Sequence, residues 1–309
     1  MSSRVEMPAP ASCYSVESFN ASSVTQAEIV ESLIRNGGCF LRGMIDQQSI
    51  DAMLNDVQPY LDADVPWEGD FFPKETRRVN GLPAKSPLYT EKVLGHPLIT
   101  AVSNDLLTTR TSTWIGDKQE HYVSPPYLNS TSVLAIGPGA RAQQLHRDDS
   151  IHHTKLPKIT SDQYTKDRDT ALGIFLAASK TTVANGATRF IPGSHLDASG
   201  YGPGDESKVV YAEMEPGDVF LMLASCFHGG SANTTTDQTR KLFGSFVCRG
   251  YLRQEENQFL ANPIEEVKKM PESIQRMIGY SVSSPYCGWV DLKDPISFVR
   301  DVKSGYKDL

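Results

Sequence analysis

The chain has 309 residues and a formal net charge of -7, and its 30 Lys and Arg residues are dispersed, which excludes the basic patch of a nucleic-acid-binding protein. It has no apolar run long enough to cross a membrane and no basic segment followed by an apolar one at its start, so we expect neither a membrane span nor a signal peptide. The five cysteines are scattered without a Cys-x-x-Cys pair, which suits a reducing compartment, and we expect a cytoplasmic protein.

The N-terminal part of the chain predicts a loose arm followed by helices. Residues 1–22 are rich in Ser, Ala and Pro, which is typical of a segment without fixed structure. Thr25 and Glu28 match a capping box, and apolar residues at helical spacing follow until Gly37 ends the helix. We expect a second helix over about 47–61.

The segment 63–87 has no clear period, although it contains Trp67, Phe71 and Phe72. A stretch of this length without regular structure is often functional, so we interpret it as a loop that forms one wall or lid of a pocket. The alternative is a surface excursion whose aromatic side chains pack on the core. A further helix is expected over 94–107.

After residue 111 the chain predicts short strands separated by Gly and Pro turns. The expected apolar strands are 133–136, 171–178, 219–223 and 240–247. Many short strands with helices mainly at the chain ends predict a mainly β fold, a double-stranded β-helix of the jelly-roll or cupin-like type with flanking α-helices. We expect one such domain over 23–309, with a helical C-terminal segment from 263 that covers the barrel mouth or a neighbouring subunit.

His146 and Asp148 are the first two candidate metal ligands. In an extended strand, side chains two positions apart lie on the same face, so an imidazole and a carboxylate would point the same way. His228 is the candidate for the third ligand, because it follows a buried strand and precedes two glycines that allow close approach. Two histidines and one carboxylate hold non-heme Fe(II) with coordination positions left open. An isolated His-x-Asp pair would more often be a surface hydrogen bond.

Arg240 and three further histidines each have a functional and a structural interpretation. Arg240 follows His228 by twelve residues and could pair with the far carboxylate of a 2-oxo dicarboxylic acid, whereas a lone arginine is ordinarily a surface ion-pair partner. We interpret His152 and His153 as a solvated loop pair and His195 as a structural hydrogen-bonding residue.

Together these motifs resemble the phytanoyl-CoA dioxygenase family of Fe(II)/2-oxoglutarate oxygenases. The resemblance runs from the first helix to about residue 290 and is closest to the fungal branch that tailors meroterpenoids and indole alkaloids. The motifs that carry it are Gln143-x-x-His146-x-Asp148, Asn185-Gly186-Ala187-Thr188, Pro192-Gly193-Ser194-His195, Pro216-Gly217-Asp218, His228 with Arg240, and the stretch 76–82.

The resemblance implies a set of ligand contacts. It assigns His146, Asp148 and His228 to Fe(II), Arg240 to the distal carboxylate of 2-oxoglutarate, and Gln143 and Thr188 to polar contacts with the same cosubstrate, with O2 as the oxidant. It also implies a homodimer. Two departures stand out: Ala184 replaces a glutamate common in the family, and the segment between Asp149 and Ala171 is long and basic.

The implied activity is oxidation of a hydrophobic small molecule, such as a fungal meroterpenoid, by hydroxylation, desaturation, rearrangement or several oxidations in sequence. Candidates for the substrate wall are Asn80, Leu82, Phe246 and the 150–168 loop, with plain packing as the alternative for each. Two other functions fit the same residues: a non-catalytic jelly-roll protein, and a zinc hydrolase that uses the same three ligands.

Overall fold

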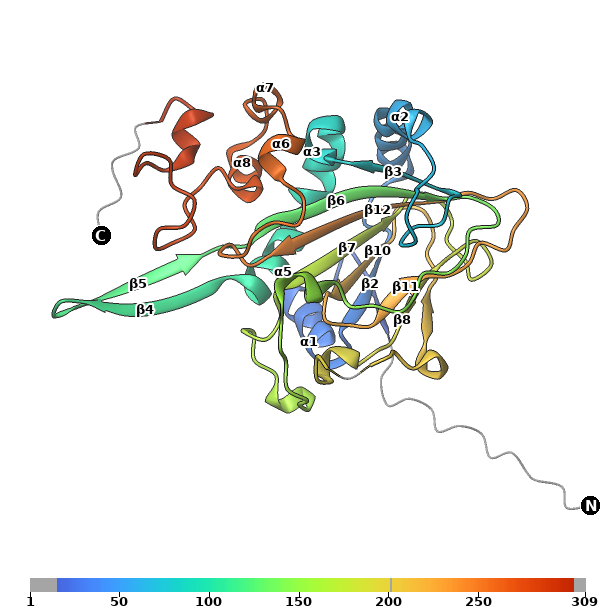
Figure 1. Ribbon diagram of the computed structural model, residues 1–309, viewed down its shortest axis with the longest axis horizontal. Coiled ribbons are helices and arrows are strands. Elements are labelled where there is room, and N and C mark those ends of the chain that lie inside the picture. The colour runs from blue at the N-terminus through green and yellow to red at the C-terminus, as the bar shows by residue number, and fades with distance from the viewer. Residues whose placement is uncertain (1–15, 201, 303–309) are drawn as a thin grey trace, which may run out of the picture.

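A seven-stranded sheet forms the base of the fold (Figure 1) in a computed structural model that describes residues 16–200 and 202–302. Its strand order is β1-β2-β10-β7-β12-β6-β3. The strands are β1 (Glu17–Asn20), β2 (Gly38–Arg42), β3 (Thr76–Asn80), β6 (Tyr127–Ile136), β7 (Ala171–Ala177), β10 (Val219–Leu223) and β12 (Arg240–Cys248).

The middle of this sheet is apolar on both faces. Every residue of β7 and of β10 is buried, as the continuous apolar runs in their sequences predict. In β6, by contrast, buried residues alternate with partly exposed ones over much of the strand, so one face of β6 borders an open space.

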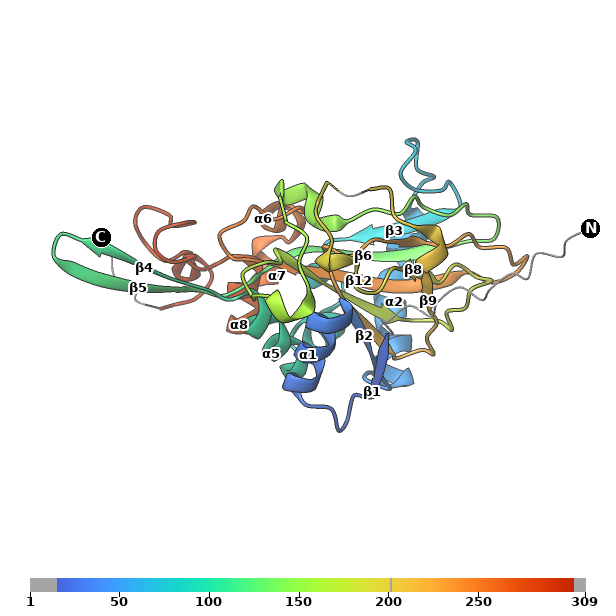
Figure 2. The ribbon, with the colours of Figure 1, turned by 90° about the horizontal axis from the view of Figure 1, so that it is seen from below.

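A smaller sheet of three strands completes the jelly roll. It consists of β8 (Thr188–Phe190), β9 (Val210–Ala212) and β11 (His228–Gly230), in the order β11-β8-β9, and Figure 2 shows β8 and β9 beside the larger sheet. An isolated bridge between His146 and His228 pairs the segment that contains His146 with β11. The mainly β, jelly-roll prediction is confirmed.

Helices flank the strands, as expected. The longer ones are α1 (Gln26–Asn36), α2 (Gln47–Ala63) and α5 (Pro97–Leu107). Helix α1 begins with the predicted capping box of Thr25 and Glu28 and ends at Gly37, whose φ of 79° is the left-handed conformation that glycine adopts freely. The apolar sides of all three helices belong to one continuous core.

The remaining elements are short or lie apart from the sheets. Strands β4 (Thr109–Ile115) and β5 (Lys118–Ser124) form a hairpin that projects from the body (Figure 1). Of the described helices, none has both the length and the apolar character that crossing a membrane requires. The short helices are α3 (Leu82–Lys85), α4 (Pro87–Tyr89), α6 (Gln258–Ala261), α7 (Ile264–Val267), α8 (Glu272–Ile278), the π-helix Thr90–Leu94, and the 3-10 turns Asp148–His152, Ser161–Gln163, Ser194–Leu196, Glu206–Lys208 and Pro295–Phe298.

Two expectations for the N-terminal part were wrong. Residues 17–20 are not part of a loose arm, because β1 pairs in parallel with β2; residues 1–15 of that arm lie outside the described residues. The segment 63–87 is not a plain loop, because β3 pairs with β6 in antiparallel fashion. Both are edge strands with polar side chains, so they lack the apolar signal by which a buried strand is recognised.

Candidate metal and cosubstrate site

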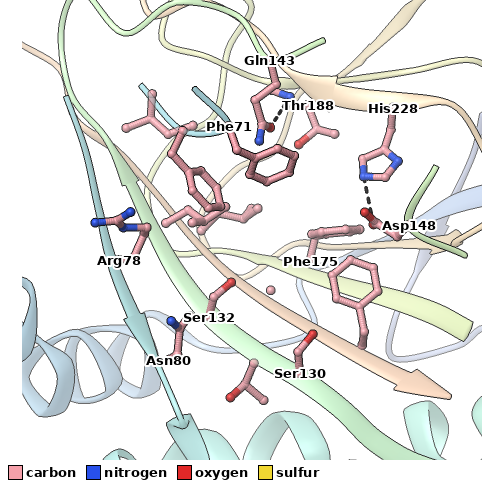
Figure 3. A pocket seen from close by; sticks show the side chains of 18 of the residues that line it. Phe71, Arg78, Asn80, Ser130, Ser132, Gln143, Asp148, Phe175, Thr188 and His228 are labelled. Carbon is pink, nitrogen blue, oxygen red and sulfur yellow. Dashed lines mark hydrogen bonds and ion pairs between the residues drawn. The ribbon is translucent and has the colours of Figure 1, made fainter. Parts of the chain in front are cut away.

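A cavity of about 760 Å³ lies between the two sheets. The larger sheet contributes side chains from β3, β6, β7 and β12, and the smaller sheet contributes them from β8 and β11. The alternating residues Ser130, Ser132, Leu134 and Ile136 give β6 one face toward this cavity. The space that borders β6 is therefore a pocket, and Figure 3 shows its lining at close range.

His146, Asp148 and His228 meet at one side of the pocket. One nitrogen or oxygen atom from each of them lies within 4.8 Å of the others. His146 Nε2 is 3.4 Å from Asp148 Oδ1. His228 Nε2 is 3.1 Å from Asp148 Oδ2, and Figure 3 marks this contact with a dashed line. The three residues that the sequence singled out are thus brought together.

The route by which Asp148 reaches the site differs from the expected one. His146 exchanges two backbone hydrogen bonds of 2.9 Å with His228, but Asp148 already belongs to a 3-10 turn, Asp148–His152. The chain leaves the strand pairing at Arg147, and the turn carries the carboxylate back between the two imidazoles. The prediction that both residues share a face of one strand was therefore wrong, although the side chains still converge.

Backbone carbonyls fix the tautomer of both histidines. His146 Nδ1 is 2.8 Å from the carbonyl oxygen of Gln144, and His228 Nδ1 is 3.2 Å from that of Cys226. A carbonyl oxygen can only accept, so we assign the proton of each neutral ring to Nδ1, and this leaves the lone pair on Nε2. Imidazoles that bind metals are commonly oriented by such a contact at the other ring nitrogen.

The electrostatics of the three residues favour a charged carboxylate. Burial by itself raises the pKa of Asp148, but His228 and His146 together hold it below its usual range. Burial lowers the pKa of His146, and Asp148 more than offsets this, so that pKa is raised. Two neutral imidazole nitrogens and one carboxylate oxygen form a donor set that suits Fe(II). The residues present therefore fit the metal.

Arg240 lines the same cavity and has an unpaired nitrogen. Its side chain is buried, and Nε and Nη2 donate to the Gly186 carbonyl oxygen at 3.0 and 2.6 Å. Nη1 has no hydrogen-bond partner, and across the described ranges no carboxylate forms an ion pair with this guanidinium. Burial lowers the pKa of Arg240 to about 10, which still leaves it charged at neutral pH. An orphaned, buried cation fits an anionic ligand.

Gln143 and Thr188 lie beside this cation. Gln143 Oε1 accepts a hydrogen bond of 2.9 Å from the backbone nitrogen of Gly230, which fixes the side-chain amide at the pocket wall. Thr188 Oγ1 is 3.4 Å from Arg240 Nη2. The three residues predicted to contact the cosubstrate, Gln143, Thr188 and Arg240, therefore lie together at one end of the cavity. Figure 3 shows this for Gln143 and Thr188.

The expected substrate wall is only partly present. Asn80 and Phe246 line the pocket, but Leu82 does not: it is fully buried in the core, where its backbone nitrogen donates to Thr131 Oγ1. The 150–168 loop contributes no residue to the lining either. Its end is held elsewhere, because Arg168 donates to the carbonyl oxygen of His195. The predictions for Leu82 and for this loop were wrong.

The other histidines occupy the positions expected of structural residues. His195 is fully buried, its Nε2 lies 2.9 Å from the carbonyl oxygen of Ile34, and burial lowers its pKa against the opposing effect of Asp169. The expectation of a solvated pair was wrong for His152, which is half-buried and whose Nε2 contacts the carbonyl oxygen of Arg253 at 3.3 Å, whereas His153 is exposed as expected.

Several pocket residues gave no clear signal in the sequence. Phe175 is hidden in an apolar run that predicts only burial. Glu255 and Glu256 follow β12 in a segment without regular period. Ser130 and Ser132 could have been found, because they continue the alternation of the strand that ends at Ile136. Trp67, Phe71 and Phe72 do line the pocket, in agreement with the expected wall.

Solved structures share this fold. The non-heme α-ketoglutarate-dependent carbocyclase SnoK from nogalamycin biosynthesis has a TM-score of 0.53 at 18% identity, over 75% of this chain and 86% of its own. HygX from Streptomyces hygroscopicus, solved with nickel and 2-oxoglutarate bound, has a TM-score of 0.52 at 15% identity, over 75% of this chain and 90% of its own. At such identities the likeness shows the fold alone.

Similarity in sequence shows the family of the chain. The family model described as phytanoyl-CoA dioxygenase matches residues 33–242. The dioxygenase peniF of Penicillium patulum is 38% identical over 291 residues, which cover 94% of each chain. The dioxygenase himG of Aspergillus japonicus is 39% identical over 286 residues, which cover 90% of this chain and 88% of its own. The chain therefore belongs to the phytanoyl-CoA dioxygenase family and is an oxidoreductase of the Fe(II)- and 2-oxoglutarate-dependent type.

Proposed function

We propose that this protein oxidises a C–H bond of a hydrophobic small molecule, with His146, Asp148 and His228 as the iron ligands and Arg240 as the main anchor of 2-oxoglutarate. The observation that carries the proposal is the pairing of two features in one cavity. Three metal-type donors converge at one point, and Arg240, whose buried Nη1 has no partner in the described chain, lines the same cavity.

The ligand set determines which chemistry is available. When bound, Fe(II) uses O2 to convert 2-oxoglutarate into succinate and CO2, and the second oxygen atom serves to oxidise the substrate. Asp148 supplies one negative charge, and each histidine donates its Nε2 lone pair because Nδ1 is held by a backbone carbonyl. These three residues would hold the ion and leave coordination positions open for cosubstrate and oxidant.

Arg240 orients the cosubstrate. Its fork can form two parallel hydrogen bonds to a carboxylate, and it is held in place by the two bonds that it donates to the Gly186 carbonyl oxygen. Thr188 Oγ1 and the Gln143 amide nitrogen are placed to donate to the same ligand. The pocket thereby fixes which end of a 2-oxo dicarboxylic acid reaches the metal.

Aromatic side chains favour a hydrophobic substrate. The rings of Phe175 and Phe246 lie 5.4 Å apart, and the ring of Phe71 lies 5.7 Å from that of His146. Such rings exclude water from the reacting C–H bond and supply contact area. We further propose a fungal secondary metabolite as substrate, of which a meroterpenoid is one example, in accord with the Penicillium and Aspergillus relatives. Hydroxylation is the simplest outcome; desaturation, rearrangement or repeated oxidation would follow from a different placement of the substrate.

An anaerobic titration tests the proposal. Apo protein is titrated with Fe(II) and then with 2-oxoglutarate, and the visible charge-transfer band of a chelated 2-oxo acid is recorded. We expect the band in the wild type and its loss in His146→Ala and His228→Ala. Metal binding without the band would favour the zinc hydrolase, and no metal binding would favour a non-catalytic jelly-roll protein.

A further inference from the structure

Two carboxylates in the pocket lack a cation. Glu255 and Glu256 both line the cavity, yet neither forms an ion pair with a Lys or Arg anywhere in residues 16–200 or 202–302. The remaining acidic lining residue outside the metal site, Asp64, is neutralised by Arg78 at 3.1 Å. The unpaired negative charge of the pocket is therefore confined to these two glutamates.

The two glutamates have different roles. Glu256 Oε2 accepts hydrogen bonds from the Thr131 backbone nitrogen at 3.1 Å and from the buried Gln258 at 3.0 Å, so this residue ties the segment after β12 to β6. Such a role is explained by the fold alone. Glu255 is also tied to β6, through Asn129 and Ser130, but it is exposed, whereas Glu256 is half-buried.

Glu255 is held with one oxygen free. Its backbone nitrogen donates to Asn129 Oδ1 at 2.8 Å, and its Oε2 accepts from Ser130 Oγ at 2.8 Å and from Asn129 Nδ2 at 3.3 Å. No hydrogen bond within the described structure reaches Oε1. Ser130, which holds this carboxylate, lies across the pocket from Gln143 and Thr188 (Figure 3). Ser130 binds Oε2 of Glu255, so this carboxylate lies on the side of the pocket away from Gln143 and Thr188.

The aromatic lining adds a second feature that suits a cation. The Arg78 guanidinium already lies over the rings of Trp67 and Phe72, at 4.9 and 5.6 Å from their centroids. The further lining rings of Phe71, Phe175 and Phe246 have no such partner in the described chain. Aromatic faces together with a carboxylate are the usual means of binding an organic cation.

The charge balance points the same way. The charges of Fe(II), Asp148, Arg240 and a doubly charged 2-oxoglutarate sum to zero, so the loaded site would leave the negative charges of Glu255 and Glu256 without a cation among the described residues. Of these two residues, Glu255 is the exposed one and is therefore the one open to a substrate. We propose that the substrate carries a basic, protonated nitrogen and that Glu255 Oε1 binds it. The inference rests on the proposed function, because it assumes that Arg240 is occupied by the cosubstrate.

A matched pair of probes tests this inference. Tryptamine and tryptophol have the same ring and chain and differ in an ammonium against a hydroxyl group. Their affinities are measured by anaerobic calorimetry on protein loaded with Fe(II) and 2-oxoglutarate. The wild type should bind the amine about tenfold more tightly or better, as expected for a charge-assisted hydrogen bond. Glu255→Gln, which keeps the bonds from Ser130 and Asn129, should bind both probes about equally.

A glutamate outside the pocket serves as the control. Glu265 on α7 pairs with Lys268 on the surface, so Glu265→Gln should keep the wild-type preference for the amine. The inference is overturned if Glu255→Gln retains that preference, or if the wild type shows none or binds neither probe. The 2-oxoglutarate affinity of each protein is measured first: its absence in the wild type would refute the proposed function, and an unchanged value in Glu255→Gln shows that the variant is folded.

Discussion

Replacing Arg240 by alanine should weaken 2-oxoglutarate binding far more than it weakens the fold. The side chain is buried, its Nη1 has no partner within the described protein, and a ligand carboxylate there would be paired away from water. Truncating one partner of a buried, hydrogen-bonded charge pair costs about 2–5 kcal/mol. The dissociation constant should therefore rise roughly thirty- to several-thousand-fold.

The assay compares two cosubstrates and two buried arginines. 2-Oxobutyrate keeps the 2-oxo acid group but lacks the distal carboxylate, so the wild type should discriminate strongly between it and 2-oxoglutarate, whereas Arg240→Ala should hardly discriminate. Arg249 is equally buried and donates to the Asp169 carbonyl oxygen at 2.8 Å, but it does not line the pocket. Arg249→Ala should lower stability and keep the discrimination. Strong discrimination in Arg240→Ala would refute the assignment of the anchor.

Further predictions address backbone, pH, pocket and assembly. A Cβ at Gly217, with φ of 89°, would collide with the Ile45 carbonyl oxygen, whereas Gly139 has φ of 84° and open space around it; Gly217→Ala should therefore cost about 1–3 kcal/mol more in urea unfolding than Gly139→Ala. Burial lowers the pKa of His195, so the stability that its neutral ring contributes should be present above about pH 6.5 and should decline as the pH falls below that value. In His195→Gln the free energy of unfolding should fall less steeply over the same acid range. An equally steep fall in the variant would contradict this explanation. Phe175→Leu should raise succinate formation without substrate by admitting water, whereas Phe220→Leu, a buried neighbour 6.2 Å away that does not line the pocket, should not. A homodimer predicts a light-scattering mass of twice 34.0 kDa; a value of 34.0 kDa would argue against it.

The metal triad could be predicted because the prediction depended on residue types and not on the backbone conformation. Two histidines, an aspartate and a following arginine form a rare combination, so the residue types indicated the site even though the expected strand geometry at Asp148 was wrong. Buried elements were equally predictable: an apolar run such as β7 or β10 has few alternatives to a central strand. The signal of a buried strand lies within one short segment, and that of the metal site lies in two, around His146 and around His228.

The rest of the pocket depends on tertiary contacts that no local pattern records. Glu255 reaches the cavity only because Asn129 and Ser130 hold the segment after β12 against β6. Leu82 was expected at the substrate wall and instead joins the core, because the short helix α3 turns it away from β3. The 150–168 loop is polar, and polarity alone does not tell which face of the molecule it covers.

The two proposed anchors together would make the oxidised position depend on the distance between the substrate nitrogen and the metal site. Arg240 would hold the cosubstrate at one end of the pocket and Glu255 the substrate nitrogen at the other, with the metal donors at the side and aromatic rings between. The atom presented to the metal would then be set by the number of bonds that separate it from the charged nitrogen. A substrate lengthened by one methylene at its far end should consequently be oxidised at the same number of bonds from its nitrogen, and thus one carbon further from the far end. A pocket that relied on hydrophobic contact alone would let the chain slide and would not keep a fixed distance from the nitrogen. Product analysis of such a substrate pair, in the wild type and in Glu255→Gln, tests this. A fixed number of bonds from the nitrogen in the wild type, lost in Glu255→Gln, would support the anchor at Glu255.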